Sequence, residues 1–77
     1  MRKIKALKGR WIQNAEGDLI NLNSFIAIRK ATSEDGLIIQ GILFRDERSW
    51  LSIAVYGKKE KKMWEDDFNF ILKIINS

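Results

Sequence analysis

The chain has 77 residues, with 14 lysines and arginines against 10 aspartates and glutamates, a formal net charge of +4, and no cysteine, histidine or proline. A chain of this length forms one domain, and the missing residue types exclude disulfides and disfavour zinc or haem sites. Hydrophobic residues make up 45% of the chain, which is too many for intrinsic disorder. Surface scaling predicts a folded area of roughly 4,850 Å² and a thin core, so oligomerisation is the stabilising device that remains open.

The positive charge is concentrated in the first ten residues. Residues 1–10 hold five basic side chains and no acidic one, whereas the rest of the chain has a net charge of −1. A second, shorter basic stretch runs from Lys58 to Lys62. Any attraction to an acidic partner therefore depends on these two stretches.

No apolar run reaches the roughly 20 residues that are needed to span a bilayer, and no uninterrupted apolar stretch follows the basic amino terminus. The sequence therefore predicts a soluble, cytoplasmic protein. A membrane-surface tether is a third interpretation of the basic arm, but Ile4, Ala6 and Leu7 offer little apolar area for insertion.

Short apolar segments separated by turn-forming residues predict an antiparallel sheet. The expected strands are Trp11–Gln13, Leu19–Leu22, Phe25–Ala31, Leu37–Phe44 and Trp50–Tyr56. Turns are expected at 14–18, where Gly17 can supply a positive φ, and at 32–36. A charged tip at 45–48 joins the last two strands as a hairpin. The arm forms either a first strand, because polar and apolar residues alternate over Lys3–Ala6, or a flexible extension.

The carboxyl-terminal segment changes to a helical period. Its apolar residues fall on one stripe at i, i+4, i+7, i+8 and i+11, and are Trp64, Phe68, Ile71, Leu72 and Ile75. Acidic residues 65–67 come near the expected beginning and Lys73 near the end, which is the order that the helix dipole favours. The start of the helix stays open over several residues because no capping residue lies between Gly57 and Trp64.

Strands followed by one helix predict an α+β domain that spans residues 1–77. We expect a basic arm or first strand in 1–10, a curved antiparallel sheet of about five strands in 11–57, and a helix in 58–77 that packs on this partly open barrel. The expected core contains Ile26, Ile28, Ile42, Leu51, Ile53, Val55, Trp64, Phe68, Ile71 and Ile75.

These elements carry more apolar surface than one sheet and one helix easily bury. Both faces of the last two strands are apolar, and the helix has a second apolar flank roughly 80–120° from its main stripe. Either a nearly closed barrel uses the helix as a plug, or one surface binds a second copy or another protein. The candidate interface residues are Trp50, Tyr56, Met63, Phe70 and Ile74. The leading prediction is a non-catalytic binding module that acts by protein–protein contact as a homodimer.

The sequence argues against an enzyme and implies no cofactor. It has no histidine for acid–base work and no cysteine nucleophile, and its five glycines are isolated, so no phosphate-binding loop is present. Acidic pairs occur at 34–35, 46–47 and 66–67, where solvated turns or a helix start explain them better than an acid–base pair. A carboxylate metal site at 65–67 is poorly specified.

Single-stranded nucleic acid is the alternative partner. Basic residues with aromatic side chains between them are the usual pattern of such proteins. The candidate contacts are Arg2, Lys3, Lys5, Lys8, Arg10, Trp11, Arg48, Lys58 and Lys59. We favour protein contact because the body of the chain has no net positive charge to attract phosphates.

Three segments carry a resemblance. The matching segments are Trp11-Ile12 followed by Glu16–Asn23, the hairpin around residues 44–46 and 51–53, and the helix segment Asp67–Leu72. In these segments the chain resembles a group of short bacterial proteins that have no assigned activity. The resemblance spans about residues 11–76 and implies a small module of a sheet and a helix, related to pleckstrin-homology-like barrels. It carries over no functional residue, and the basic Met1–Arg10 arm is an addition to the pattern.

Overall fold

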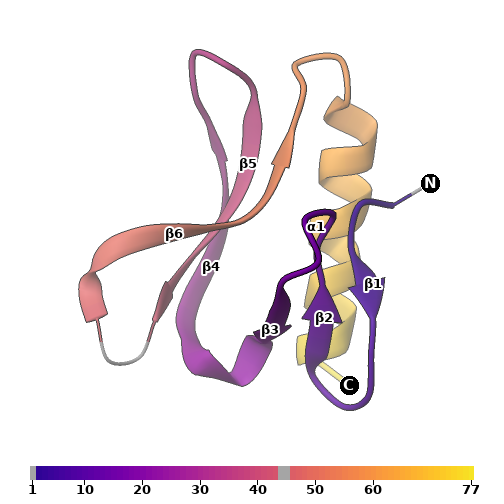
Figure 1. The fold of residues 1–77 in the computed structure, drawn as a ribbon, viewed down its shortest axis with the longest axis vertical. Coiled ribbons are helices and arrows are strands. Elements are labelled where there is room, and N and C mark those ends of the chain that lie inside the picture. The colour runs from indigo at the N-terminus through magenta and orange to yellow at the C-terminus, as the bar shows by residue number, and fades with distance from the viewer. Residues whose placement is uncertain (1, 44–45) are drawn as a thin grey trace.

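The computed structural model describes residues 2–43 and 46–77, without the side chains of 46–48. Its elements are β1 (Lys5–Ala6), β2 (Trp11–Gln13), β3 (Leu19–Asn21), the 3-10 turn η1 (Leu22–Ser24), β4 (Phe25–Thr32), β5 (Leu37–Leu43), β6 (Asp46–Tyr56) and α1 (Lys61–Ile75) (Figure 1). The strands form two antiparallel three-stranded sheets, β1-β2-β3 and β4-β5-β6. The α+β class with antiparallel strands and a carboxyl-terminal helix is confirmed, whereas the single curved sheet of about five strands is matched only roughly, because the strands are divided between two sheets that are not closed.

The amino-terminal segment is the first strand of the smaller sheet. Lys5 pairs with Gln13 and Ala6 with Ile12, and Ile4 is 4% exposed in the core. Gly9 has a φ of 66° in the turn between β1 and β2, in the left-handed region that favours glycine. Residues 5–6 of the arm therefore form a short strand, as in the first of the two alternatives.

The turn between β2 and β3 is organised by Asn14. Its Oδ1 accepts hydrogen bonds from the backbone N–H groups of Glu16 and Asp18, while Gly17 adopts a φ of 89°. The Asn14 amide also donates to the carbonyl of Ile53 at 2.9 Å. This bond fastens the smaller sheet to β6 of the larger one.

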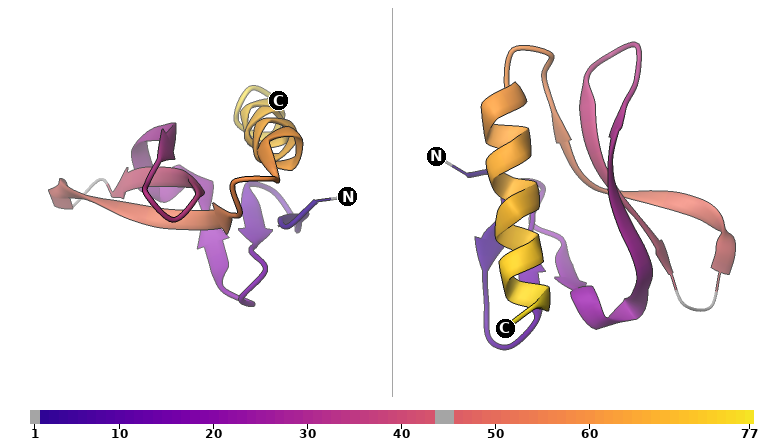
Figure 2. Two further views of the ribbon diagram at one scale, coloured as in Figure 1. Left: turned by 90° about the horizontal axis from the view of Figure 1, so that it is seen from above. Right: turned by 180° about the vertical axis from the view of Figure 1, so that it is seen from behind.

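Helix α1 lies beside the smaller sheet and contacts β5 and β6 of the larger one (Figures 1 and 2). The indole of Trp64 donates to the carbonyl of Ile38 at 2.9 Å. Within the described residues, no helix has the length and apolar character needed to cross a membrane. The core between these elements consists of Ile4, Ile12, Leu22, Ile39, Ile53, Ala54, Tyr56, Trp64 and Ile71.

The predicted core is correct in part. Ile53, Trp64 and Ile71 are buried, and Ile28, Ile42, Phe68 and Ile75 are half-buried, but Ile26, Leu51 and Val55 are more than two-fifths exposed. For Val55 the reason is a bulge in β6. Ala54 pairs with Ile39 and Ser52 with Gln40, so Ile53 is an extra residue that lies on the core side together with Ala54. Strict alternation therefore assigned Val55 to the wrong side of the sheet, whereas Leu51 pairs with the core-side residue Gly41 and is exposed there, and Ile26 lies at a separate irregularity in β4 between Phe25 and Ala27.

The last hairpin is longer than expected. Strand β6 begins at Asp46, which pairs with Leu43, so residues 46–48 belong to a strand and not to a tip. Phe44 and Arg45, the last residue of the expected strand and the first of the expected tip, lie outside the described part of the chain. This end of the larger sheet extends away from α1 (Figures 1 and 2).

Candidate protein-interaction site

One face of the larger sheet turns away from the core, and we call it the outer face. Its side chains follow from the register, because residues alternate between the two sides of a strand and Ile39 and Ala54 lie on the core side. They form three rows across the sheet, which are Ala31–Ile38–Val55, Arg29–Gln40–Ser52 and Ala27–Ile42–Trp50. Two of the three rows are apolar.

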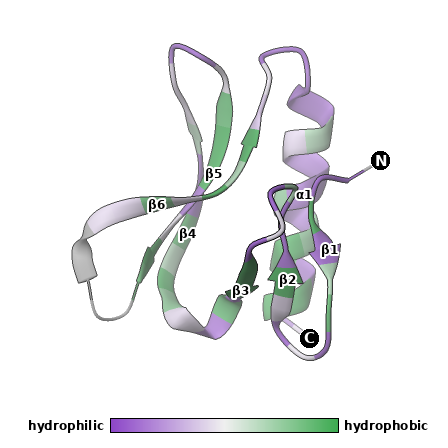
Figure 3. Ribbon diagram, viewed as in Figure 1, coloured by the Kyte–Doolittle hydropathy of each residue, from purple (hydrophilic) through white to green (hydrophobic). Residues whose placement is uncertain are grey.

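None of these nine side chains is buried. Val55 is 49% exposed, and Ile38, Ile42 and Trp50 are half-buried. On the core side of the same strands, Ile39 and Tyr56 are 0% and 1% exposed. Figure 3 shows the apolar residues along β5 that supply both sides. The fold therefore buries one face of this sheet and leaves an apolar surface on the other.

The polar row crosses the middle of the outer face and is internally bonded. Arg29 Nε donates to Gln40 Oε1 at 3.1 Å, and the Arg29 guanidinium lies 3.6 Å from the centre of the Trp50 ring. This stacking holds the Trp50 indole on the sheet. The outer face is therefore a preorganised surface on which the Arg29 guanidinium lies against the Trp50 ring.

The structure separates the predicted interface residues. Trp50 lies on the outer face, but Tyr56 is 1% exposed, so its placement in an interface is wrong. Met63, Phe70 and Ile74 are half-buried on α1 and pack against the core. The second apolar flank of the helix is therefore largely covered within the chain.

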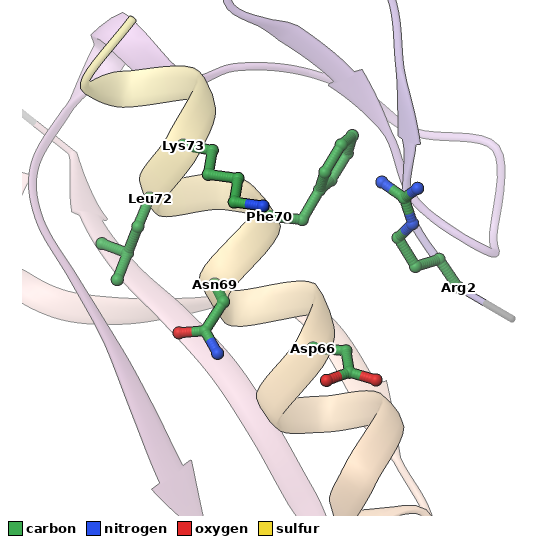
Figure 4. Close-up of a pocket in the computed structure, with 6 residues that line it drawn as sticks. All are labelled: Arg2, Asp66, Asn69, Phe70, Leu72 and Lys73. Carbon is green, nitrogen blue, oxygen red and sulfur yellow. The ribbon is translucent and has the colours of Figure 1, made fainter.

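The amino-terminal segment covers part of this apolar flank of α1. A shallow groove is lined by Arg2, Asp66, Asn69, Phe70, Leu72 and Lys73 (Figure 4). The Arg2 guanidinium lies 3.8 Å from the centre of the Phe70 ring, and Asp66 pairs with Lys62 at 3.4 Å. The groove is mixed in charge and the Phe70 ring already has a partner.

The basic residues proposed for nucleic acid do not form one surface. Arg2 stacks on Phe70, Lys3 Nζ pairs with Glu60 at 3.0 Å, and Arg10 Nη1 donates to Asn23 at 3.1 Å. Several other candidates are exposed, namely Lys5, Lys8, Trp11, Lys58 and Lys59. The Arg48 side chain lies outside the described residues. The sequence places these bases close together, but the fold uses three of them to fasten the arm.

A buried polar cluster joins β6, α1 and the arm. Asp67 is fully buried, and its Oδ2 accepts from the Tyr56 hydroxyl at 2.7 Å and from the Lys3 backbone N–H at 3.0 Å. Burial, and then the bond to Asp67, raises the pKa of Tyr56 well above its usual range. The backbone N–H of Gly57, and then Lys3, lowers the pKa of Glu60. The sequence assigned the 66–67 pair to the helix start, but α1 begins at Lys61 and Asp67 is buried in its middle.

The geometry of this cluster is that of a structural hydrogen-bond network that holds β6, α1 and the arm together. A high tyrosine pKa disfavours the phenolate, which is the form that would act as a base. Within the described residues, no group of three or more acidic side chains is placed to hold a metal ion. Asp66 is turned toward Lys62 and Asp67 toward Tyr56, so these neighbouring carboxylates have different partners.

Sequence reasoning missed two features. Leu19 is 63% exposed on β3 and Leu7 is 38% exposed just after β1, and these strands are too short to show alternation. Asp67 was missed as a core residue, although its place one turn after Trp64 and one turn before Ile71 puts it beside buried positions. The helical spacing was the available signal.

Comparison of the chain with protein-family models, with curated proteins and with solved structures found no match.

Proposed function

We propose that this chain is a non-catalytic binding module that acts by protein–protein contact and associates with a second copy through the outer face. The observation that carries the proposal is that two apolar rows of the larger sheet are left unburied by a domain with a thin core. Pairing two outer faces would bury these rows and give each sheet a second covered side.

The total surface supports the same proposal. The folded chain has an accessible area of 5421 Å², whereas a compact monomer of this mass has roughly 4,850 Å². The excess of roughly 570 Å² is close to the lower end of what one protomer contributes to a modest interface, about 600 Å². Val55, Ile38 and Ile42 belong to this surface, and Trp50 adds a large aromatic side chain of the type enriched at interface centres.

Nucleic-acid binding remains an alternative without a specific observation in its favour. The aromatic and basic residues that its mechanism needs are divided between the two sheets and the turn before α1, and the Trp50 ring is stacked by Arg29. Single-strand binding uses accessible rings beside a continuous basic groove.

Sedimentation velocity on a matched pair of variants tests the proposed surface. Val55→Lys places a charge on the outer face, and Leu19→Lys places the same charge at an exposed position of β3. We expect Val55→Lys to weaken self-association at least about tenfold and Leu19→Lys to leave it unchanged. Equal association by both variants, or a loss in Leu19→Lys alone, contradicts the proposed surface.

A further inference from the structure

A second uncovered feature lies along β4. This strand is an edge of the larger sheet, and it keeps regular pairing with β5 from Ala27 to Thr32. Alternate residues of an edge strand turn their N–H and C=O groups away from the sheet, where another extended chain can bond to them. The edge is therefore a template for strand addition that does not involve the outer face.

An apolar groove runs beside this edge. It encloses about 320 Å³ between the start of β4 and the end of α1, which lie at the same end of the molecule (Figure 2). Its apolar walls are Leu22, Phe25, Ile26, Ile28, Leu72 and Ile75. Ile26 and Leu72 are 48% and 38% exposed, so the groove is open on the side where a strand would add.

The groove has one charged lining residue, Arg10, and a second basic residue, Lys30, lies beyond it on β4. Arg10 lines the groove beside Asn23 and bonds to it at 3.1 Å, and no acidic residue is among the described residues that line it. Lys30 extends over α1 further along β4, with its Nζ 5.1 Å from the centre of the Trp64 ring. The six residues of β4 from Phe25 to Lys30 span roughly 20 Å in the extended conformation.

From these features we infer that the groove between β4 and α1 binds an extended peptide segment of a partner protein, with aliphatic residues at alternate positions and acidic residues at its ends. The backbone of the segment pairs with β4, its aliphatic side chains lie against Leu72 and Ile75, and its carboxylates meet Arg10 and Lys30. This inference does not rest on the self-association proposed above.

A second copy is a poor occupant of this edge. Arg29 and Lys30 lie in the middle of the regular part of β4, so pairing β4 with the same strand of another protomer brings these like charges together. The aliphatic walls also suit side chains such as valine and leucine better than nucleic-acid bases, which stack on exposed aromatic rings.

The test uses fluorescence anisotropy with three labelled peptides of eight residues. The first has glutamate at both ends and valine or leucine at alternate positions, the second has lysine at the ends, and the third is the first with alternate backbone nitrogens methylated on its β4-facing edge. We expect the first to bind and the other two to bind at least about tenfold more weakly, because one loses the ion pairs and the other the strand hydrogen bonds.

Variants locate the site. Lys30→Glu should weaken binding of the glutamate-ended peptide about tenfold, and the matched reversal Lys58→Glu at an exposed turn should leave it unchanged. Because Lys30→Glu could also alter folding, amide NMR shifts of the wild-type chain provide a second readout, and the largest peptide-induced changes should fall in β4.

Three results would overturn the inference: no binding of the first peptide, equal binding of the methylated peptide, or tighter binding of a single-stranded oligonucleotide. If the peptide binds only after a dimer dissociates, the β4 edge is the site where a second copy binds, and the inference is wrong. The Val55→Lys variant separates the two proposals, because it should lose self-association and keep peptide binding. If the peptide does not bind but the chain still self-associates, the peptide-binding groove is refuted and the self-association proposal is not.

Discussion

The Tyr56 hydroxyl donates a 2.7 Å hydrogen bond to Asp67 in the core, where both residues are almost completely buried. The same carboxylate accepts the backbone N–H of Lys3, so one acid joins the last strand, the helix and the arm. In a domain without disulfides this contact stabilises the fold as a crosslink would, because it holds together segments that are 64 residues apart in sequence.

Tyr56 should resist ionisation. It is the only tyrosine in the chain, so tyrosinate absorbance reports on it alone. Its raised pKa means that the folded state holds the proton more tightly, so this contribution to stability is present at neutral pH and is lost as the pH rises above about 10. Alkaline titration followed by absorbance and circular dichroism should show tyrosinate only as the protein unfolds. Tyrosinate that forms near pH 10 in a folded chain contradicts the burial.

Removal of the Asp67 carboxylate should be costly. Asp67→Ala leaves the Tyr56 hydroxyl and the Lys3 N–H without their partner, and we expect a loss of about 2–4 kcal/mol in the free energy of unfolding. Asp66→Ala is the matched control, because Asp66 is exposed and pairs with Lys62 on the helix surface, which is worth less than about 0.5 kcal/mol. Urea unfolding measures both. A similar loss in the free energy of unfolding in the two variants would show that the buried Asp67 carboxylate does not stabilise the fold through these hydrogen bonds.

Gly41 should not accept a side chain. A Cβ at this position would lie 2.7 Å from Phe25 Cε1 and 3.1 Å from Ile53 Cδ1, so the ring of Phe25 packs directly over the glycine. We expect Gly41→Ala to lower the free energy of unfolding by about 1–3 kcal/mol. Gly57→Ala, whose Cβ would make an ordinary 3.4 Å contact with Glu60, should change stability little. Thermal unfolding of both variants is the measurement, and equal melting temperatures would contradict the packing.

Phe70→Glu distinguishes the helix flank from the outer face. Phe70 packs against the core and carries the Arg2 guanidinium, so the substitution should lower the free energy of unfolding by about 2 kcal/mol. The molecules that remain folded should self-associate as the wild type does, and Phe70→Leu should retain most of the stability. A stable Phe70→Glu chain that has lost self-association would move the interface to α1.

The sequence was sufficient for the fold class because the change from short apolar segments to a helical period is a local signal. The helix stripe correctly predicted Trp64 and Ile71 as core residues. Strand faces were harder to predict, since one extra residue at Ile53 reverses the alternation in β6 and exchanges the environments of Val55 and Tyr56. No composition or period reveals such a bulge.

The candidate site was predicted less completely. Trp50 was identified from the surplus of apolar residues, but its neighbours Ile38 and Ile42 come from another strand and their face depends on the register. The ion pair of Lys3 with Glu60 and the stacking of Arg2 on Phe70 also depend on the tertiary fold, because the partners are more than 50 residues apart in sequence. A basic stretch in a sequence does not show which of its charges the fold has already paired.

Sedimentation equilibrium of the wild-type chain over a wide range of concentrations tests self-association most directly. The proposal predicts that the average mass rises from the chain mass of 9.0 kDa toward twice that value as concentration increases, and that Val55→Lys stays near the chain mass under the same conditions. A wild-type mass of 9.0 kDa at every concentration would contradict it.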